Sequence, residues 1–208
     1  RIMTSRVVLA SRNAHKIEEM ARILDEAGLH VEVVGIDAFP DGSVPDVPET
    51  EASFEGNALL KARAVCAATG VPAVADDSGL CVPSLGGEPG VHSAYYAGKE
   101  GDRATRDARN NAKLLAELAK RDDRRAHYVC VLVLLRHAED PQPVIAEGEW
   151  HGEILAAPRG AGGFGYDPLF LVPSANCSSA ELTAEAKNGI SHRALAFARL
   201  AERLRAGI

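Results

Sequence analysis

Hydrophobic positions along the first part of the chain follow two different periods. Residues 7–10 form a short apolar run typical of a buried strand, and residues 31–36 form a second one. Between them, apolar side chains recur at the helical spacing i, i+3, i+4, i+7, at Ile17, Met20, Ala21 and Leu24. Gly28 follows this face and suits a helix C-terminus, because glycine tolerates the left-handed conformation found there. The pattern therefore predicts a strand, a helix and a second strand.

The middle of the chain alternates in the same way. Three prolines between residues 40 and 48 predict an extended loop, after which Ser53 is a suitable N-cap for a helix running to about Gly70. Residues 73–75 predict a short strand that ends at residues 76–79. A further helix, from about residue 102 to residue 121, is expected to bury its alanine-rich side. The members of that side are Ala104, Ala108, Ala112, Leu115 and Ala119.

Strand patterns dominate the next part, at residues 128–135, 144–154 and 169–172, with a glycine-rich loop before the last of them. Two helices follow, and Ser191 is the expected N-cap of the second. This order predicts an α/β protein with a mixed sheet and helices on its faces. Because there is no internal repeat and no long linker, we predict a single domain over residues 1–208.

Composition narrows the class of protein. The chain has 208 residues, of which 46% are hydrophobic and 25% charged, enough for a sizeable core. No apolar run approaches the ~20 residues that span a bilayer, and the start of the chain lacks a secretory pattern. We therefore expect a cytoplasmic protein without membrane contact, in which Met3 is the native initiator and Arg1 and Ile2 are added residues. The four cysteines are widely spaced, which favours reduced thiols over disulfides or zinc.

The charge balance restricts the partners. The formal net charge is −6 and no block of Lys or Arg is present, which disfavours sequence-independent binding of nucleic acid. A polyanionic ligand would have to be bound by a few placed cations and a metal.

A candidate anion site lies where the first strand gives way to the first helix, at residues 11–16. Free backbone N–H groups and the helix dipole favour anions there. Asn13 can cap the helix or bind a phosphate oxygen, and Lys16 adds a positive charge; a routine cap beside a solvated lysine explains the segment equally well. No G-x-x-x-x-G-K-[ST] motif occurs, which excludes a P-loop NTPase.

Two further polar groups follow. Ser53, Asn57 and Lys61 recur at i, i+4, i+8 and form one stripe that faces either a cleft or solvent. Asp76 and Asp77 end a predicted strand, where open α/β sheets place ligands, and only one of them is expected to face the ligand because neighbouring strand residues point to opposite faces. Carboxylates and substrate phosphates are the ligands that Mg²⁺ prefers. The alternative for residues 76–79 is a turn with an Asx hydrogen bond.

The C-terminal part holds a candidate base site. Residues 163–168 combine glycines with Phe164, Tyr166 and Asp167, and aromatic faces can stack bases while a carboxylate accepts from ring N–H groups. A structural turn with two core aromatics is the alternative. Lys187 and residues 191–193 could form hydrogen bonds with an oxygen-rich edge of a base. Alternatively, they are simply polar residues around a helix N-terminus.

Taken together, these segments closely resemble the inosine/xanthosine triphosphate pyrophosphatases, a family that removes deaminated purine nucleotides. The motifs occur in the family's order: Ser11-Arg12-Asn13-Ala14-His15-Lys16, Phe54 through Ala62, Ala75-Asp76-Asp77-Ser78-Gly79-Leu80, Gly86-Gly87 with Pro89-Gly90, Gly162 through Pro168, and Ser191-His192-Arg193. The resemblance implies two lobes around a long mixed sheet, a nucleotide in a central cleft, and a homodimer. It implies Mg²⁺-dependent hydrolysis of ITP, dITP and XTP to the monophosphate and pyrophosphate.

The resemblance also assigns roles by position. The triphosphate would be held by Ser11, Arg12, Asn13, Ala14, His15, Lys16 and Lys61. Glu49 and Asp77 would bind Mg²⁺, Asp77 would act as the general base for water, and Ser78 would contact the substrate. The base pocket would comprise Phe164, Gly165, Tyr166, Asp167, Lys187, His192 and Arg193.

Three features depart from the family pattern or qualify the resemblance. Gly56 stands where many bacterial members carry an acid, and Asn188-Gly189 is an unusual pair beside the pocket lysine. Glu49 is chosen over Glu51 as the second metal ligand by its spacing from Phe54 along the sequence. Two other functions stay open: a magnesium-dependent pyrophosphatase acting on modified pyrimidine or ordinary deoxynucleotides, and a non-catalytic nucleotide-binding module.

Overall fold

A computed structural model describes residues 6–207, so the interpretation of Arg1, Ile2 and Met3 lies outside the described residues. The strands are β1 (Arg6–Leu9), β2 (Glu32–Val34), β3 (Ala73–Cys81), β4 (Arg125–Leu135), β5 (Val144–Ile154), β6 (Phe170–Val172) and β7 (Cys177–Ser178). The α-helices are α1 (Ala14–Glu26), α2 (Phe54–Thr69), α3 (Arg103–Leu118), α4 (Ala184–Ile190) and α5 (His192–Arg205).

The strands form one seven-stranded sheet in the order β2-β1-β3-β4-β5-β6-β7. β1 pairs in parallel with β2 and β3, whereas β6 pairs in antiparallel fashion with β5 and β7. The predicted α/β class with a mixed sheet is confirmed.

The chain divides into two compact units. Unit 1 comprises residues up to 77, 130–148 and from 193 onward, and unit 2 comprises residues 78–129 and 149–192. Each unit has its own hydrophobic core, so each can hold its polar side chains on a packed support.

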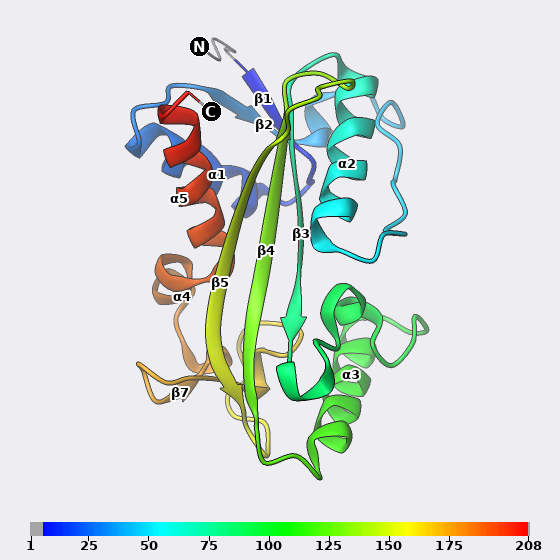
Figure 1. The fold of residues 1–208 in the computed structure, drawn as a ribbon, viewed down its shortest axis with the longest axis vertical. Coiled ribbons are helices and arrows are strands. Elements are labelled where there is room, and N and C mark those ends of the chain that lie inside the picture. The colour runs from blue at the N-terminus through cyan, green and yellow to red at the C-terminus, as the bar shows by residue number, and fades with distance from the viewer. Residues whose placement is uncertain (1–5, 208) are drawn as a thin grey trace. The chain divides into compact units, whose positions relative to one another are not determined.

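Unit 1 is layered. Its core joins alternate residues of the strands to the inward faces of α1 and α5, including Met20, Leu24, Phe197 and Leu200. α2 lies on the other side of these strands (Figure 1). The alternation arises because successive strand residues point to opposite faces, and it lets helices approach β3 from both sides.

The predicted helix caps are largely observed. Asn13 caps α1, Ser53 caps α2, and Gly28 follows α1 in the left-handed conformation with φ +77°. Ser191 lies between α4 and α5 and is buried.

The predicted buried side of α3 is wrong. Ala104, Ala108 and Ala112 are exposed, and the buried residues are Asn110, Leu114 and Leu118. Leucines bury far more apolar surface than alanines. In addition, the Asn110 amide is satisfied in the interior by the backbone of residues 93, 94 and 97. Both effects turn the helix about its axis relative to the alanine pattern.

The end of β3 was also predicted wrongly. The strand continues from Ala73 through the two aspartates to Cys81 and does not turn at residues 76–79. Polar residues are tolerated inside the strand because Asp76 and Asp77 are paired with side chains of neighbouring helices.

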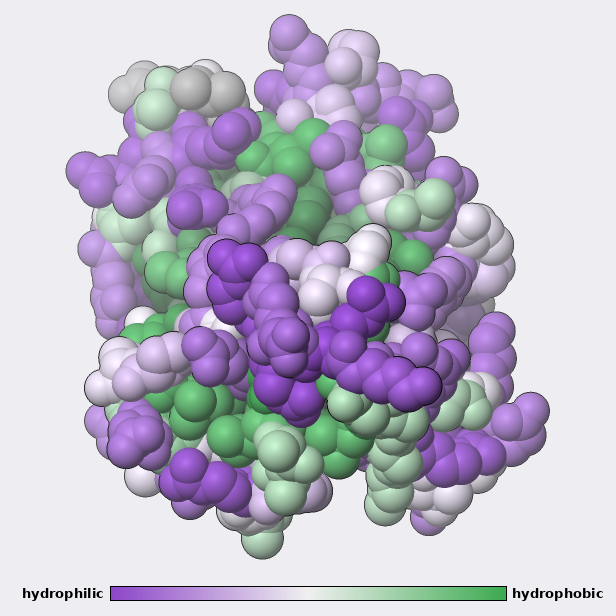
Figure 2. Space-filling model, turned by 60° about the horizontal axis from the view of Figure 1, so that its bottom comes forward, coloured by the Kyte–Doolittle hydropathy of each residue, from purple (hydrophilic) through white to green (hydrophobic). Residues whose placement is uncertain are grey.

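Within residues 6–207, no helix has both the length and the apolar content that crossing a membrane requires. On the face drawn in Figure 2, hydrophilic side chains cover most of the surface, and hydrophobic ones emerge in patches between them. Large hydrophobic side chains exposed among the described residues include Tyr95 and Phe164.

Candidate active site

In unit 1, the junction of β1 and α1 brings one lysine to β3. Lys16 Nζ lies 2.9 Å from Asp76 Oδ2, and both side chains are largely buried. The Asn13 amide oxygen accepts from the N–H groups of His15 and Lys16, so Asn13 acts as the helix cap. Arg12 instead pairs with Asp37, and the His15 side chain is 96% exposed.

On the other side of β3, α2 presents two residues of the predicted polar stripe to Asp77. Asn57, which is buried, donates from Nδ2 to Asp77 Oδ2 at 2.9 Å. Lys61 Nζ lies 2.8 Å from Glu49 Oε1 and 4.0 Å from Asp77 Oδ1. Asn57 and Lys61 therefore face the strand, whereas Ser53 is exposed and accepts from the Gly56 N–H as the helix cap.

The electrostatics of unit 1 favour an ionised Asp76. Burial raises the pKa of the Asp76 carboxyl, whereas Lys16 lowers it through its charge and its hydrogen bond. The charges of Arg193 and Lys61 lower it further, so the pKa falls to about 2. A carboxylate that stays ionised throughout the neutral range fixes the Lys16 ammonium in place. Nearby Glu19 differs, because burial raises its pKa against the opposing charges of Arg193, Arg22 and Lys16.

The donor set around Lys61 fits a hard divalent cation. Asp77 and Glu49 both offer carboxylate oxygens near the same ammonium. Among the described residues, no cluster of three or more His, Cys, Asp or Glu side chains could hold a metal. Two carboxylates, completed by water and phosphate oxygens, are a usual protein contribution to Mg²⁺ binding.

The loop before α2 distinguishes the two candidate glutamates. The Glu49 carboxylate contacts Lys61, which also approaches Asp77. Glu51 donates its backbone N–H to Asn57 Oδ1, and its side-chain stem packs over Gly56, where a Cβ would lie 2.7 Å from Glu51 Cβ. This geometry favours Glu49 as the ligand and gives Glu51 a part in holding the loop.

In unit 2, Asp167 organises the second predicted group. It is buried, its Oδ2 accepts from Lys187 Nζ at 2.5 Å and from the Phe164 N–H at 2.9 Å. Its Oδ1 accepts from Ser179 Oγ at 3.0 Å and from the Tyr128 hydroxyl at 3.4 Å. Asp167 thus fixes Lys187, which the family resemblance assigns to the same base pocket.

The two aromatic residues of this loop have different environments. Tyr166 is buried and donates its hydroxyl to the Ser93 carbonyl at 2.7 Å, as in the structural alternative. Phe164 is 52% exposed, and Lys187 Nζ lies 4.9 Å from its ring centroid. His192 stacks on Tyr128, with ring centroids 4.9 Å apart.

Some predicted residues fall in different parts of the structure. Lys16, Lys61, Glu49, Asp77 and Arg193 belong to unit 1, and Ser78, residues 164–167, Lys187 and His192 belong to unit 2. Arg193 acts on the carboxylates of Asp76 and Glu19 through its charge.

Sequence reasoning singled out two residues that organise unit 1 as polar candidates but did not predict their partners. Asp76 pairs with Lys16, and Asn57 holds Asp77. The available signals were the i, i+4 spacing of Asn57 and Lys61 and the alternation of neighbouring strand residues.

The described geometry defines an α/β protein that carries a lysine–carboxylate cluster on β3 and an exposed aromatic ring beside a fixed lysine. Comparison with known proteins agrees. The profile of the Ham1 family matches residues 7–203, which is nearly the whole chain.

The chain belongs to the Ham1 family. It is 53% identical over 202 residues to the dITP/XTP pyrophosphatase of Ralstonia nicotianae, with 96% of each chain covered. It is 55% identical over 202 residues to the dITP/XTP pyrophosphatase of Burkholderia pseudomallei, covering 96% of this chain and 93% of that one. A solved HAM1 protein from Coxiella burnetii has 43% sequence identity and a TM-score of 0.87, with 97% of this chain and 98% of that chain covered. The resemblance inferred from the motifs is confirmed, and the curated relatives are named as nucleoside-triphosphate pyrophosphatases, which is the predicted enzyme class.

Proposed function

We propose that this protein hydrolyses dITP, ITP and XTP to the nucleoside monophosphate and pyrophosphate, using Mg²⁺, and so removes deaminated purine nucleotides from the nucleotide pool. The observation that carries this proposal is the Asp77 carboxylate, held by Asn57 and facing Lys61. The curated relatives named dITP/XTP pyrophosphatases support the substrate class.

Asp77 is suited to activate water. Its Oδ2 is oriented by the Asn57 amide, and its Oδ1 lies on the side of Lys61. Asp77 would hold the attacking water and take its proton as the water approaches the α-phosphorus, and pyrophosphate would leave. General-base assistance of this kind is typically worth ~10²–10⁴-fold in rate.

The lysines supply positive charge for the phosphates. Lys16, held by Asp76, and Lys61, held by Glu49, are both largely buried, so their charges are poorly screened by water. At the N-terminus of α1, the backbone N–H groups of Arg12 and Ala14 would add donors.

Glu49 and Asp77 would hold Mg²⁺, which when bound neutralises charge that develops on the phosphates. Because Lys61 contacts both carboxylates, this lysine is expected to move toward the phosphates on loading.

The base would be recognised by unit 2. Lys187, fixed by Asp167, can donate to the 6-oxo group of hypoxanthine or xanthine, and Phe164 offers an exposed face for stacking. Adenine presents a donor at that position, which would leave the lysine unsatisfied. Sites that require a particular hydrogen bond discriminate by up to ~10⁴–10⁵-fold. His192, which stacks on Tyr128, belongs to the same unit.

The test is pyrophosphate release with Mg²⁺ from ITP, dITP, XTP, GTP, ATP and dTTP. Strong turnover of the inosine and xanthosine nucleotides with weak turnover of ATP and dTTP is the expected result. A flat profile would favour a general pyrophosphatase. Absence of turnover by folded protein would favour a binding module. Sedimentation of the same preparation tests the homodimer that the resemblance implies.

A further inference from the structure

The backbone around Phe164 is held at every polar group. The Phe164 N–H donates to Asp167 Oδ2 at 2.9 Å, and the Phe164 carbonyl accepts from the Asp167 N–H at 3.1 Å. The Gly165 N–H donates to Asp107 Oδ2 at 2.9 Å, and the Gly165 carbonyl accepts from Asn111 Nδ2 at 2.9 Å. The two-residue segment is therefore fixed on one side by its own turn and on the other by α3.

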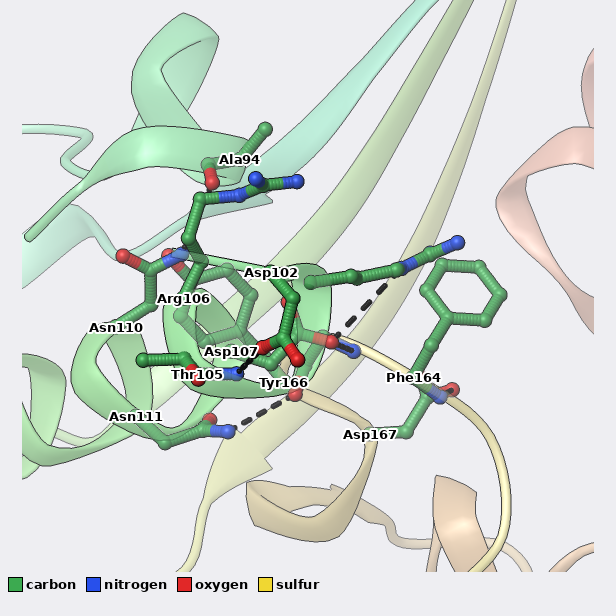
Figure 3. A network of polar contacts seen from close by, with 12 residues as sticks. Ala94, Asp102, Thr105, Arg106, Asp107, Asn110, Asn111, Phe164, Tyr166 and Asp167 are labelled. Carbon is green, nitrogen blue, oxygen red and sulfur yellow. Dashed lines mark hydrogen bonds and ion pairs between the residues drawn. The ribbon is translucent and has the colours of Figure 1, made fainter. Parts of the chain in front are cut away.

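The contacts from α3 come from one stripe of that helix. Arg103, Asp107 and Asn111 recur at i, i+4, i+8 and so lie on one face. Asp107 and Asn111 point toward the loop that carries Phe164, while the Phe164 ring points away from the helix (Figure 3). Arg103 Nε lies 3.9 Å from Asp107 Oδ2, and the Arg103 guanidinium lies 4.5 Å from the Phe164 ring centroid.

The Phe164 ring contributes little buried apolar surface to the core of unit 2. Phe164 is 52% exposed, so much of its apolar surface stays in water, whereas Tyr166 two residues later is buried. A half-exposed ring on a backbone whose four polar groups are all bound is preorganised, and preorganisation strengthens binding because little order is lost when a ligand arrives.

We infer that Asp107 and Asn111 are positioning residues for purine binding, which act by fixing the Phe164–Gly165 peptide and thereby the stacking face of Phe164. Arg103 adds a positive charge beside the same ring, with its Nε 3.9 Å from Asp107 Oδ2. The inference rests on the proposed function, in which Phe164 stacks on the base.

The experiment measures binding of two ligands that separate the base from the phosphates. Inosine monophosphate and inorganic pyrophosphate, each with Mg²⁺, are titrated calorimetrically into the full chain and its variants. Asn111→Asp keeps the side-chain shape but places a carboxylate against the Gly165 carbonyl. We expect its inosine monophosphate affinity to fall about tenfold, the worth of one lost hydrogen bond. Its pyrophosphate affinity should stay within about twofold of the unaltered protein.

Two variants at position 107 distinguish the loss of one hydrogen bond from a general loss of folding. Asp107→Asn keeps an acceptor for the Gly165 N–H, whereas Asp107→Ala removes it. Asp107→Ala should therefore weaken inosine monophosphate binding about tenfold, with substantial rescue in Asp107→Asn. Ala108→Asn, on an exposed position of the same helix, should leave both affinities unchanged. Thermal unfolding verifies that each variant is folded.

Two results overturn the inference: unchanged inosine monophosphate binding in Asn111→Asp and Asp107→Ala, or an equal loss of both ligands, which indicates a general structural role. Pyrophosphate release from ITP by the unaltered protein tests the proposed function separately. If the unaltered protein releases no pyrophosphate yet binds inosine monophosphate, the proposed function fails and the variants still decide the inference. If it binds no inosine monophosphate, both fail.

Discussion

Replacement of Gly56 by alanine provides a test in which two physical effects have opposite signs. Gly56 lies in the first turn of α2, and alanine there would ordinarily stabilise a helix by about 0.5–1 kcal/mol. In this structure, however, an added Cβ would lie 2.7 Å from Glu51 Cβ and 2.9 Å from Glu51 Cγ. Carbon atoms prefer separations of about 3.5–4.0 Å, so the loop would have to move by roughly 0.8 Å or more.

The displaced loop carries two site contacts. Glu51 donates its N–H to Asn57, which holds Asp77, and Glu49 pairs with Lys61. Overpacking typically costs about 1–3 kcal/mol, so Gly56→Ala should lower the free energy of unfolding by about 1–2 kcal/mol in spite of the helix propensity of alanine. A misplacement approaching 1 Å can cost up to about 10²-fold in rate, and turnover of ITP should fall at least severalfold.

Urea denaturation and pyrophosphate release measure the two effects. Glu51→Gly removes the atoms that a Cβ at position 56 would meet, so the double variant should recover the loss caused by Gly56→Ala. Such a double-mutant cycle should give a coupling free energy of about 1–2 kcal/mol. If Gly56→Ala alone is as stable as the unaltered protein or more so, with normal turnover, the inferred clash is refuted.

Three other perturbations test separate parts of the structure. Asp77→Asn should reduce turnover by at least about 10²–10⁴-fold with an unchanged circular dichroism spectrum, and near-normal turnover would exclude Asp77 as the base. The pKa of Asp76 is lowered to about 2 in the folded state, so its contribution to stability is present above about pH 4 and is lost as the pH falls through 2. Asp76→Asn should therefore be destabilised at pH 7, with a difference from the unaltered protein that shrinks on acidification; a constant difference in denaturation between pH 2 and 7 would contradict this. Asp140 is buried and accepts from the backbone N–H groups of Arg136 and Gln142 and from the Arg136 guanidinium. Asp140→Ala should therefore lower the free energy of unfolding by about 2–4 kcal/mol in thermal or chemical denaturation. A loss below about 1 kcal/mol would argue against these hydrogen bonds.

Local patterns in the sequence were sufficient for most elements of the fold. β5 has the predicted bounds, and α2 begins directly after the predicted cap, Ser53. Strand periodicity and helix capping depend on residues that are neighbours along the chain, so they can be read without tertiary information. The order of the motifs likewise identified the family.

The partners of the polar residues were decided by the tertiary structure. Asp76 and Asp77 were expected to end a strand, but they lie within β3 because Lys16 and Asn57, both distant in sequence, satisfy them from opposite sides. The orientation of α3 depends on packing: alanine can be buried or exposed at little cost, whereas Leu114 strongly favours burial.

The sequence identified Phe164, Tyr166 and Asp167 as candidates for base recognition, yet it could not separate the exposed ring from the buried one. That difference depends on Asp107 and Asn111, more than fifty residues away, which hold the intervening glycine. Composition and spacing thus determined which chemical groups are available. Long-range packing and hydrogen bonding decided which of them are exposed, ionised and fixed, because these properties depend on neighbours that only the folded chain brings together.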